Sequence, residues 1–364
     1  EADVILVNTC GFIESAKTEA IENILEACSY KQQNPELKVI VTGCLAERYR
    51  SQIEEEIPEV DAVVGCASNK AIDTIVARLF HGENHLESYG AKKDFPLGGK
   101  RVIGTPAHYA YLKIAEGCNN RCHYCAIPGI RGPLHSRDMA DCVAEARWLA
   151  GEGVKELIVV AQDPTAYGED WGKPGSICEL LDKLNKVPGL EWIRIMYAYP
   201  ERITDEFIAA MKRNDKVVPY LDLPIQHCDE EILRRMHRPG NEETLRNLIT
   251  HIRERVPEIT LRTTLITGFP GETEDDHQEL MEFIEEFRFE RAGIFTFSRE
   301  EGTRAYNMPD QVHYRTKARR YNEATMLLTR IASEIGQKQI GQQIRVLVDA
   351  PGTARTEWDA PDID

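Results

Sequence analysis

Residues 116–125 read EGCNNRCHYC, so Cys118, Cys122 and Cys125 form a C-x3-C-x2-C triplet. The apolar run AYLKIA stands directly before it and predicts a strand that ends where the cysteine loop begins. Three thiolates on one short loop can hold three corners of a cubane iron–sulfur cluster and leave the fourth iron without a protein ligand. The loop therefore predicts a [4Fe–4S] cluster with an open iron, which is a reaction site.

The alternatives for this loop are a zinc site or three buried thiols. Zinc sites favour paired C-x2-C units completed by a fourth Cys or His. His123 lies inside the loop and could be proposed as that ligand, although its neighbours already crowd the same turn. An open iron is what S-adenosylmethionine (SAM) needs, because its amino and carboxylate groups must chelate iron before an electron cleaves the sulfonium bond. We therefore favour the cluster.

Composition sets outer bounds on the function. The chain has 364 residues, 42% of them hydrophobic, and no apolar run near 18 residues, which predicts a soluble protein of two or more domains without a membrane partner. Ten cysteines without a secretory context predict a cytoplasmic protein that uses thiols as metal ligands. The net charge of -16 argues against a bare phosphate backbone as partner and favours a basic protein.

The first 85 residues predict a doubly wound parallel sheet. Apolar runs separated by helical stretches such as Glu14 to Tyr30 are typical of strands covered on both faces. Each run is followed by a cysteine: Val4 to Val7 by Cys10, Val39 to Val41 by Cys44, and Ala62 to Val64 by Cys66. Ligands bind outside the carboxyl ends of such strands, so all three thiols stand at a candidate site.

A segment rich in Gly, Lys and Pro, assigned to residues 86–106, predicts a linker to a second domain that spans residues 107–340. Six strands are predicted there: Tyr109 to Ala115, Glu156 to Ala161, Trp192 to Tyr197, Tyr220 to Ile225, Leu261 to Ile266 and Gly293 to Phe297. Helical patterns separate them, which indicates an open, partial (β/α)6 version of the TIM barrel, with its chemistry at the strand ends.

Polar and glycine residues follow each of these strands and predict a lined cavity above the cluster. They are Cys118, Gln162 with Asp163, Tyr199, Gln226 with His227, Gly268 to Glu272, and Ser298. In the loop TGFPGET, Gly268 and Gly271 allow close backbone approach, and Thr273 is a candidate helix cap. His227 alone is more often a structural histidine than a ligand or base.

Longer runs resemble one family, the radical SAM methylthiotransferases. These runs are NTCGFIESA, KVIVTGCL, AYLKIAEGCNNRCHYCAIPGIRG, AQDPTAYG, PYLDLPIQH, RRMHRPG, TLRTTLITGFPGET and DAPDID. The resemblance implies two [4Fe–4S] clusters: one on the cysteine triplet for SAM, and an auxiliary cluster for which Cys10 and Cys44 match two of three ligands. The residues expected to bind the cofactor are Tyr124, Gln162, Asp163, Gln226, Gly268 and Gly271.

Two branches of the family differ in substrate. One modifies a tRNA adenosine beside the anticodon, and the other an aspartate of the twelfth small-subunit ribosomal protein. The runs AIPGIRG, LPIQH, RRMHRPG and DAPDID are similar to the second branch, whereas the tRNA branch usually has Gln-Ser-Gly where Gln226 and His227 stand. The resemblance implies that a radical made from SAM abstracts hydrogen from the aspartate β-carbon, with electrons from a donor such as flavodoxin or ferredoxin.

The chain also departs from the family pattern. The Leu-Gly-Cys segment that would supply the first auxiliary ligand is not seen, so we expect a fragment in which the auxiliary cluster is incomplete. Cys66 could substitute, although the family places no ligand there. Residues 341–364 match only the opening of a TRAM domain, a small substrate-binding β-barrel.

Two rival functions make different predictions. A tRNA-modifying enzyme would have a basic stripe facing the cavity, and no direct tRNA substrate is expected here. A non-catalytic iron–sulfur protein for electron transfer or redox sensing would have no SAM pocket, and the six polar strand ends argue against it.

Overall fold

The computed structural model describes residues 2–99 and 101–364 and divides into two compact units. Glu1 and Lys100, which fall in the expected first domain and linker, lie outside the described residues. The first unit draws on Glu1–Leu97, Glu116–Pro133 and Ser298–Tyr306, and the second on Gly98–Ala115, Leu134–Phe297 and Asn307–Asp364. Across the described residues, no helix has the length and apolar character needed to cross a membrane.

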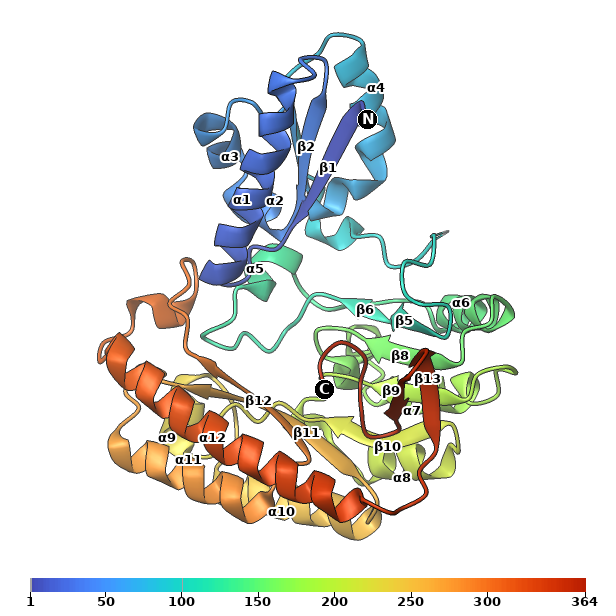
Figure 1. Cartoon of the computed structure of the whole chain (residues 1–364), viewed down its shortest axis with the longest axis vertical. Coiled ribbons are helices and arrows are strands. Elements are labelled where there is room, and N and C mark those ends of the chain that lie inside the picture. Colours follow the sequence, from blue (N-terminus) through green and yellow to red (C-terminus); the bar gives the residue numbers. More distant parts are fainter. Residues whose placement is uncertain (1, 100) are drawn as a thin grey trace. The chain divides into compact units, whose positions relative to one another are not determined.

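The first unit holds a parallel sheet in the order β1-β2-β3-β4 (Figure 1). Its strands are β1 (Val4–Thr9), β2 (Lys38–Gly43), β3 (Ala62–Gly65) and β4 (Leu86–Ser88), and the first three were predicted. Its α-helices are α1 (Glu14–Ser29), α2 (Cys44–Tyr49), α3 (Ser51–Glu56), α4 (Ile72–Phe80) and α5 (Ile127–Arg131). β1, β2 and β3 end level, because Thr9 pairs with Gly43 and Gly43 with Gly65.

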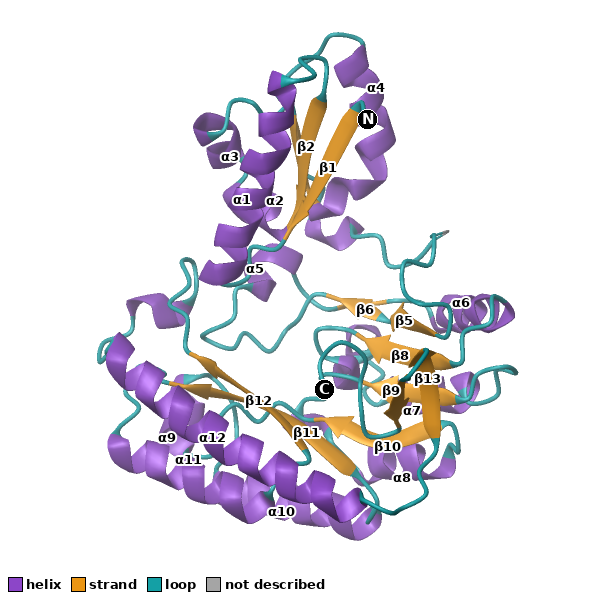
Figure 2. Cartoon of the chain, in the orientation of Figure 1, coloured by secondary structure: helices purple, strands orange, loops and turns teal. Residues whose placement is uncertain are grey.

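Alternating residues of the middle strands feed two separate hydrophobic clusters. Val39 and Val41 pack with Ile24 of α1 on one face, while Ile40 packs with Ile75 of α4 on the other. Successive side chains of a strand point to opposite faces, so continuous apolar runs need helices on both. The parallel sheet covered on both faces is therefore confirmed, and Figure 2 shows these helices flanking β1 and β2.

Glu300 ties the segment Ser298–Tyr306 to the helices of the first unit. Its side chain is 2% exposed and accepts a hydrogen bond from the backbone N–H of Glu14 at 2.8 Å. It also pairs with Arg48 at 3.0 Å and with Lys17 at 3.4 Å. Burial alone would raise the pKa of Glu300, but a hydrogen bond from Ser298 and the two cations outweigh burial and hold that pKa below its usual value.

Glu300→Gln should therefore lower the free energy of unfolding in a pH-dependent way. A carboxylate whose folded pKa is depressed contributes stability above its unfolded pKa and loses it as the pH falls through the folded pKa. We expect a loss of about 3 kcal/mol at pH 7, typical of a broken buried ion pair. The difference should shrink below about pH 4. Urea unfolding between pH 7 and pH 3 measures it, with the exposed neighbour Glu301→Gln as control; a difference independent of pH would contradict this account.

The second unit holds six parallel strands in the order β12-β11-β10-β9-β8-β5. They are β5 (Tyr109–Lys113), β8 (Glu156–Val160), β9 (Trp192–Ile195), β10 (Val217–Asp222), β11 (Thr260–Thr267) and β12 (Arg291–Thr296). The α-helices are α6 (Met139–Gly151), α7 (Ser176–Leu184), α8 (Asp205–Arg213), α9 (Glu230–Arg235), α10 (Glu242–Arg255), α11 (Glu274–Phe287) and α12 (Tyr314–Gln339). The prediction of an open (β/α)6 barrel is confirmed.

The predicted bounds of one strand were wrong. β10 covers Val217–Asp222 rather than Tyr220 to Ile225. Pro224 has no N–H to donate, so the ladder ends before it, and only an isolated bridge between Gln226 and Leu265 continues the pairing. The strand also accommodates Pro219 at a register shift against β9.

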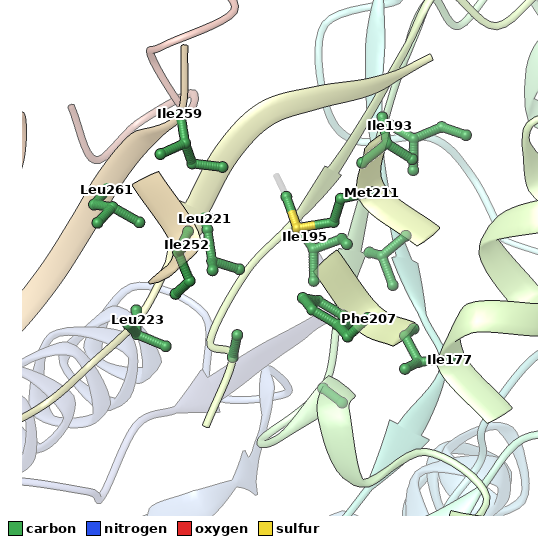
Figure 3. Packing of buried hydrophobic residues seen from close by; sticks show 14 of the residues in the cluster. Ile177, Ile193, Ile195, Phe207, Met211, Leu221, Leu223, Ile252, Ile259 and Leu261 are labelled. Carbon is green, nitrogen blue, oxygen red and sulfur yellow. The ribbon is translucent and has the colours of Figure 1, made fainter. Parts of the chain in front are cut away.

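The core of the second unit lies between its strands and helices (Figure 3). Ile193 and Ile195 of β9 share this cluster with Phe207 and Met211 of α8. The alternate residue Arg194 belongs to the opposite face, where its guanidinium lies over the Tyr220 ring. One face of each strand therefore packs against helices while the other lines the barrel interior.

The C-terminal residues dock on that interior face. β13 (Val346–Ala350) and β14 (Thr353–Thr356) form an antiparallel hairpin, and that it begins a β-barrel stays a prediction. Arg355 pairs with Glu156 at 2.8 Å, and Tyr220 donates a hydrogen bond to Asp364 at 2.7 Å. Ala360 is buried among apolar residues of the same face.

Candidate active site

The cysteine loop follows β5 and the short strand β6 (Ala115–Glu116), and it belongs to the first unit. Gly117 starts it with φ +75°, and a Cβ there would lie 2.1 Å from the Pro133 carbonyl oxygen, so only glycine fits. The backbone N–H of Cys125 donates to the Cys122 carbonyl at 3.0 Å, which closes a turn. The N–H of Asn120 points at the Cys118 Sγ at 3.4 Å.

The three thiols of this loop influence one another. Burial raises the pKa of the Cys125 thiol to about 12, and negative charge on Cys122 and Cys118 acts in the same direction. Within residues 2–99 and 101–364, no three His, Cys, Asp or Glu side chains stand in the arrangement of a metal site. The fit to a cluster therefore rests on donor chemistry: three thiols lie on one turn, and burial opposes ionisation of Cys125, an effect that a bound cation would relieve.

His123 is held by a different segment. Its carbonyl accepts a hydrogen bond from the Ala305 N–H at 2.9 Å, and its Nε2 lies 3.4 Å from Arg304 Nη1. A neighbouring guanidinium disfavours a second cation, so this imidazole is poorly placed to complete a zinc site.

The strand-end cysteines follow three neighbouring strands at the same level. Cys10, Cys44 and Cys66 each come directly after paired residues of β1, β2 and β3. Cys10 is exposed, Cys44 is partly buried and Cys66 is buried. All ten cysteines are described, and none forms a disulfide. This register places Cys10 and Cys44 at the ends of neighbouring strands.

Cys44 sits in an environment that favours its thiolate. A hydrogen bond from the Cys66 thiol, and next the Arg131 guanidinium 3.3 Å from Cys44 Sγ, lower the pKa of Cys44 to about 6 against the opposing effect of burial. The same hydrogen bond, together with burial, raises the pKa of Cys66. Of this pair, Cys44 is the better metal ligand because ligands bind as thiolates.

Arg131 connects this thiol to the cysteine loop. Its Nη1 lies 3.2 Å from the carboxylate of Glu116, whose side chain is 2% exposed, and its guanidinium lies 5.4 Å from the Phe95 ring centroid. Arg131 and Glu116 flank the three cysteines in sequence. The ion pair therefore fixes both ends of the loop against the sheet edge that carries Cys44.

Arg131→Met should destabilise the first unit, because it removes the guanidinium that pairs with the buried Glu116 carboxylate. We expect a loss of about 3 kcal/mol in urea unfolding. The double variant Glu116→Gln/Arg131→Met should recover most of this loss, since it also removes the buried negative charge. Equal losses in the single and double variants would show that packing on Phe95, rather than charge, is what Arg131 supplies.

Asp163, after β8, is buried and connects two strand ends of the second unit. It accepts hydrogen bonds from Thr165 and from Arg202, the latter at 3.1 Å. The Thr165 hydroxyl in turn accepts from the N–H of Tyr199, which follows β9, at 3.2 Å. Gln162 precedes Asp163 and is half-buried.

Gln226 and His227 follow β10 and are both buried. Gln226 has φ +72°, and its backbone bonds Thr264 and Ile266 of β11. His227 Nδ1 accepts from the Asp229 N–H at 3.1 Å, and burial lowers its pKa to about 3. A neutral, fully buried ring bonded to its own turn supports the structural interpretation of His227.

The loop TGFPGET closes on its own glutamate. The Glu272 carboxylate accepts hydrogen bonds from the N–H groups of Gly268 and Phe269 and pairs with Arg320 of α12 at 2.9 Å. Burial raises the pKa of Glu272, and Arg320 opposes that shift. Thr273 caps α11 through a capping box, as predicted. Glu272 is buried, although it opens an acidic stretch of the sequence.

Gly268 and Gly271 both have positive φ, +75° and +92°. A Cβ on Gly268 would lie 2.4 Å from Lys317 Cγ, and one on Gly271 would lie 2.4 Å from Arg235 Cζ. The loop backbone therefore runs close beneath neighbouring side chains. Whether Gln162, Asp163, Gln226 and these glycines line one cavity stays a prediction, as does the role of the half-buried Tyr124.

Sequence reasoning missed three residues: Arg131 beside Cys44, Glu300 against the helices of the first unit, and Arg304 beside His123. Arg131 stands inside the AIPGIRG run that carries the family resemblance, so its position was a usable signal. Glu300 and Arg304 are far from the cysteines in sequence, and no periodicity marks them.

Comparisons with known proteins show the family of the chain. The model of the Radical SAM superfamily matches residues 112–284, and that of the uncharacterized protein family UPF0004 matches residues 1–65. The chain is 52% identical to a ribosomal protein uS12 methylthiotransferase, RimO, of Akkermansia muciniphila, over 100% of this chain and 85% of that protein. The RimO of Acetivibrio thermocellus is 45% identical, over 100% of this chain and 83% of that protein.

Solved structures show the fold alone. A radical S-adenosylmethionine methyltransferase from Kitasatospora setae, TsrM, superposes with a TM-score of 0.60 at 13% identity, covering 80% of this chain and 61% of that one. The cobalamin-dependent radical enzyme OxsB gives 0.53 at 12% identity, covering 90% and 48%. The cysteine loop follows the first strand of a six-stranded open barrel, and the similarity to the uS12 methylthiotransferases extends over the whole of this chain. The chain therefore belongs to the radical SAM methylthiotransferases, in the family of the ribosomal protein uS12 methylthiotransferases.

Proposed function

We propose that the chain adds a methylthio group to the β-carbon of an aspartate in ribosomal protein uS12. The observation that carries the proposal is the C-x3-C-x2-C loop directly after β5, in a chain 52% identical to a uS12 methylthiotransferase. The formal charge of -16 suits a basic ribosomal protein better than an RNA backbone.

Cys118, Cys122 and Cys125 would hold the cluster that binds SAM, and this cluster supplies the electron that cleaves the sulfonium bond. The residues of the chain then have positional roles. Gly117 and the Cys122–Cys125 turn set the loop, and the pairing of Glu116 with Arg131 fixes its two ends. A reactive radical must form within contact distance of its target, so this rigidity is part of the chemistry.

An auxiliary [4Fe–4S] cluster would use Cys10 and Cys44 as two of its ligands. The level ends of β1 and β2 and the stabilised Cys44 thiolate fit that role. Arg131 would donate a hydrogen bond to the coordinated sulfur, which is how proteins tune such clusters.

For SAM we propose contacts from Tyr124, Gln162, Asp163, Gln226, Gly268 and Gly271. Glu272 supports the glycines by closing their loop from beneath. We propose a division into a first domain (1–85), a linker (86–106), a radical SAM core (107–340) and the beginning of a TRAM domain (341–364). The start of the linker is corrected by β4 (Leu86–Ser88), which pairs with β3 in the sheet of the first unit. A one-electron donor such as flavodoxin or ferredoxin is required, and reduced thiols suit the cytoplasm.

The test is anaerobic reconstitution with iron and sulfide, followed by incubation with SAM, a reductant and recombinant uS12. Mass analysis of uS12 peptides should show one aspartate with a methylthio group in place of a hydrogen. A modified adenosine in a tRNA digest, with uS12 unchanged, would select the other branch of the family. Iron incorporation without SAM cleavage would select an electron carrier.

A further inference from the structure

A cavity of about 570 Å³ in the first unit opens beside the cysteine loop. Cys122 and Cys125 form part of its wall. Five cationic side chains also line it: Arg48, Arg50, Lys92, Arg121 and Arg304. The acidic residues of the lining are Glu47 and Glu301. In a chain of net charge -16, this concentration of positive charge beside a cluster loop stands out.

Three of these cations keep their charge uncompensated. Arg48 pairs with Glu300 and Arg50 with Glu47, each at 3.0 Å. Lys92 instead donates to the carbonyl of Gly129, a neutral group. Arg304 contacts the His123 ring at 3.4 Å, and Arg121 is exposed. Among the described residues, Lys92, Arg121 and Arg304 form no ion pair.

Of the three uncompensated cations, one belongs to the cysteine loop, one contacts it, and one contacts helix α5, which follows it. Arg121 immediately precedes Cys122 and has φ +52°. Arg304 is fixed there because the Ala305 N–H bonds the His123 carbonyl at 2.9 Å. Lys92 reaches the α5 segment that follows the loop. Their positive potential therefore lies directly over Cys122 and Cys125 rather than over some distant face.

We propose that this basic pocket is the docking surface for an acidic one-electron carrier protein that reduces the cluster on Cys118, Cys122 and Cys125. The inference rests on the proposed function, since SAM cleavage consumes one electron that the chain cannot supply. In the step, the carrier loses one electron and the cluster gains it, and no bond or proton is transferred. The interfaces of electron-transfer complexes are small and polar, and charge complementarity between the two surfaces steers their formation.

The experiment compares two reductants on the reconstituted enzyme. Reduced flavodoxin is the acidic protein probe, and reduced methyl viologen is a small cation that needs no basic surface. The variant is Arg121→Glu/Arg304→Glu. Its matched control is Arg147→Glu/Lys173→Glu, which makes the same charge change at exposed residues of the second unit.

Stopped-flow absorbance measures the rate at which flavodoxin reduces the cluster. This rate should fall by ~10-fold or more in the pocket variant and by less than about twofold in the control. Added salt should slow the parent enzyme and leave the pocket variant nearly unaffected. With methyl viologen, SAM cleavage and iron content should match those of the parent. If Arg121→Glu/Arg304→Glu fails to hold iron, Arg121→Gln/Arg304→Gln replaces it and should lower the rate of reduction by flavodoxin to a smaller extent.

Equal flavodoxin rates in the parent and pocket variants would overturn the proposal. So would a raised KM for SAM with methyl viologen, because it would make the pocket a site for a small anion. Failure of the proposed function looks different: the parent enzyme with methyl viologen would cleave SAM and leave uS12 unmodified.

Discussion

Cys122→Ala is expected to abolish formation of 5′-deoxyadenosine from SAM. A cubane with one open iron needs three protein thiolates, and a loop with two cannot retain it. Cys122 also supplies the carbonyl that closes the turn with Cys125, and the backbone keeps this bond in the variant. The loss therefore reports the missing sulfur rather than a collapsed loop. Chromatography of 5′-deoxyadenosine after anaerobic reconstitution measures it.

The control is Cys178→Ala, which removes a buried thiol from α7 of the second unit. Its SAM cleavage should stay within a few fold of the parent. Cys118→Ala and Cys125→Ala should behave as Cys122→Ala does. Cleavage at the parent rate in any of the three would show that the loop is not the SAM cluster.

Cys44→Ala is expected to separate the two halves of the reaction. SAM cleavage should continue within a few fold, because the cysteine loop is intact. Methylthiolation of uS12 should fall to background, since the proposed auxiliary cluster loses the ligand whose thiolate Arg131 stabilises. Bound iron should fall to the roughly four atoms per chain that the cluster on the cysteine loop holds. Peptide mass analysis and iron counting on the same sample measure both effects.

Cys66→Ala is the matched control, because the two thiols hydrogen-bond each other and end neighbouring strands. Product formation should persist in this variant, as the family resemblance places no ligand there. Loss of product and of about four irons in Cys66→Ala would identify Cys66 as a ligand and refute the assignment.

The strands and most helices of the fold could be predicted because each is a local pattern. Thr273 was expected to cap a helix and caps α11, since a polar residue before an amphipathic run marks where a helix begins. β10 was displaced because Pro224 ends its ladder, and an apolar run alone does not show where hydrogen bonding stops.

The candidate site was predictable only where its residues lie close together in the sequence. The cysteine triplet lies within eight residues, and its spacing indicates its ligand type directly. The basic pocket draws its cations from four separate segments, so no window of sequence contains it. The same holds for Arg131 beside Cys44, a contact between residues that only the folded first unit brings together.

The docking of the C-terminal residues has a consequence for biosynthesis. Glu156 and Tyr220 are translated well before their partners Arg355 and Asp364. Domains assemble as they emerge from the ribosome, so a nascent barrel must tolerate incompletely partnered polar groups in its interior until those partners are translated. Ribosome-bound chains stalled before residue 355 should therefore be more sensitive to protease in the barrel strands than released chains.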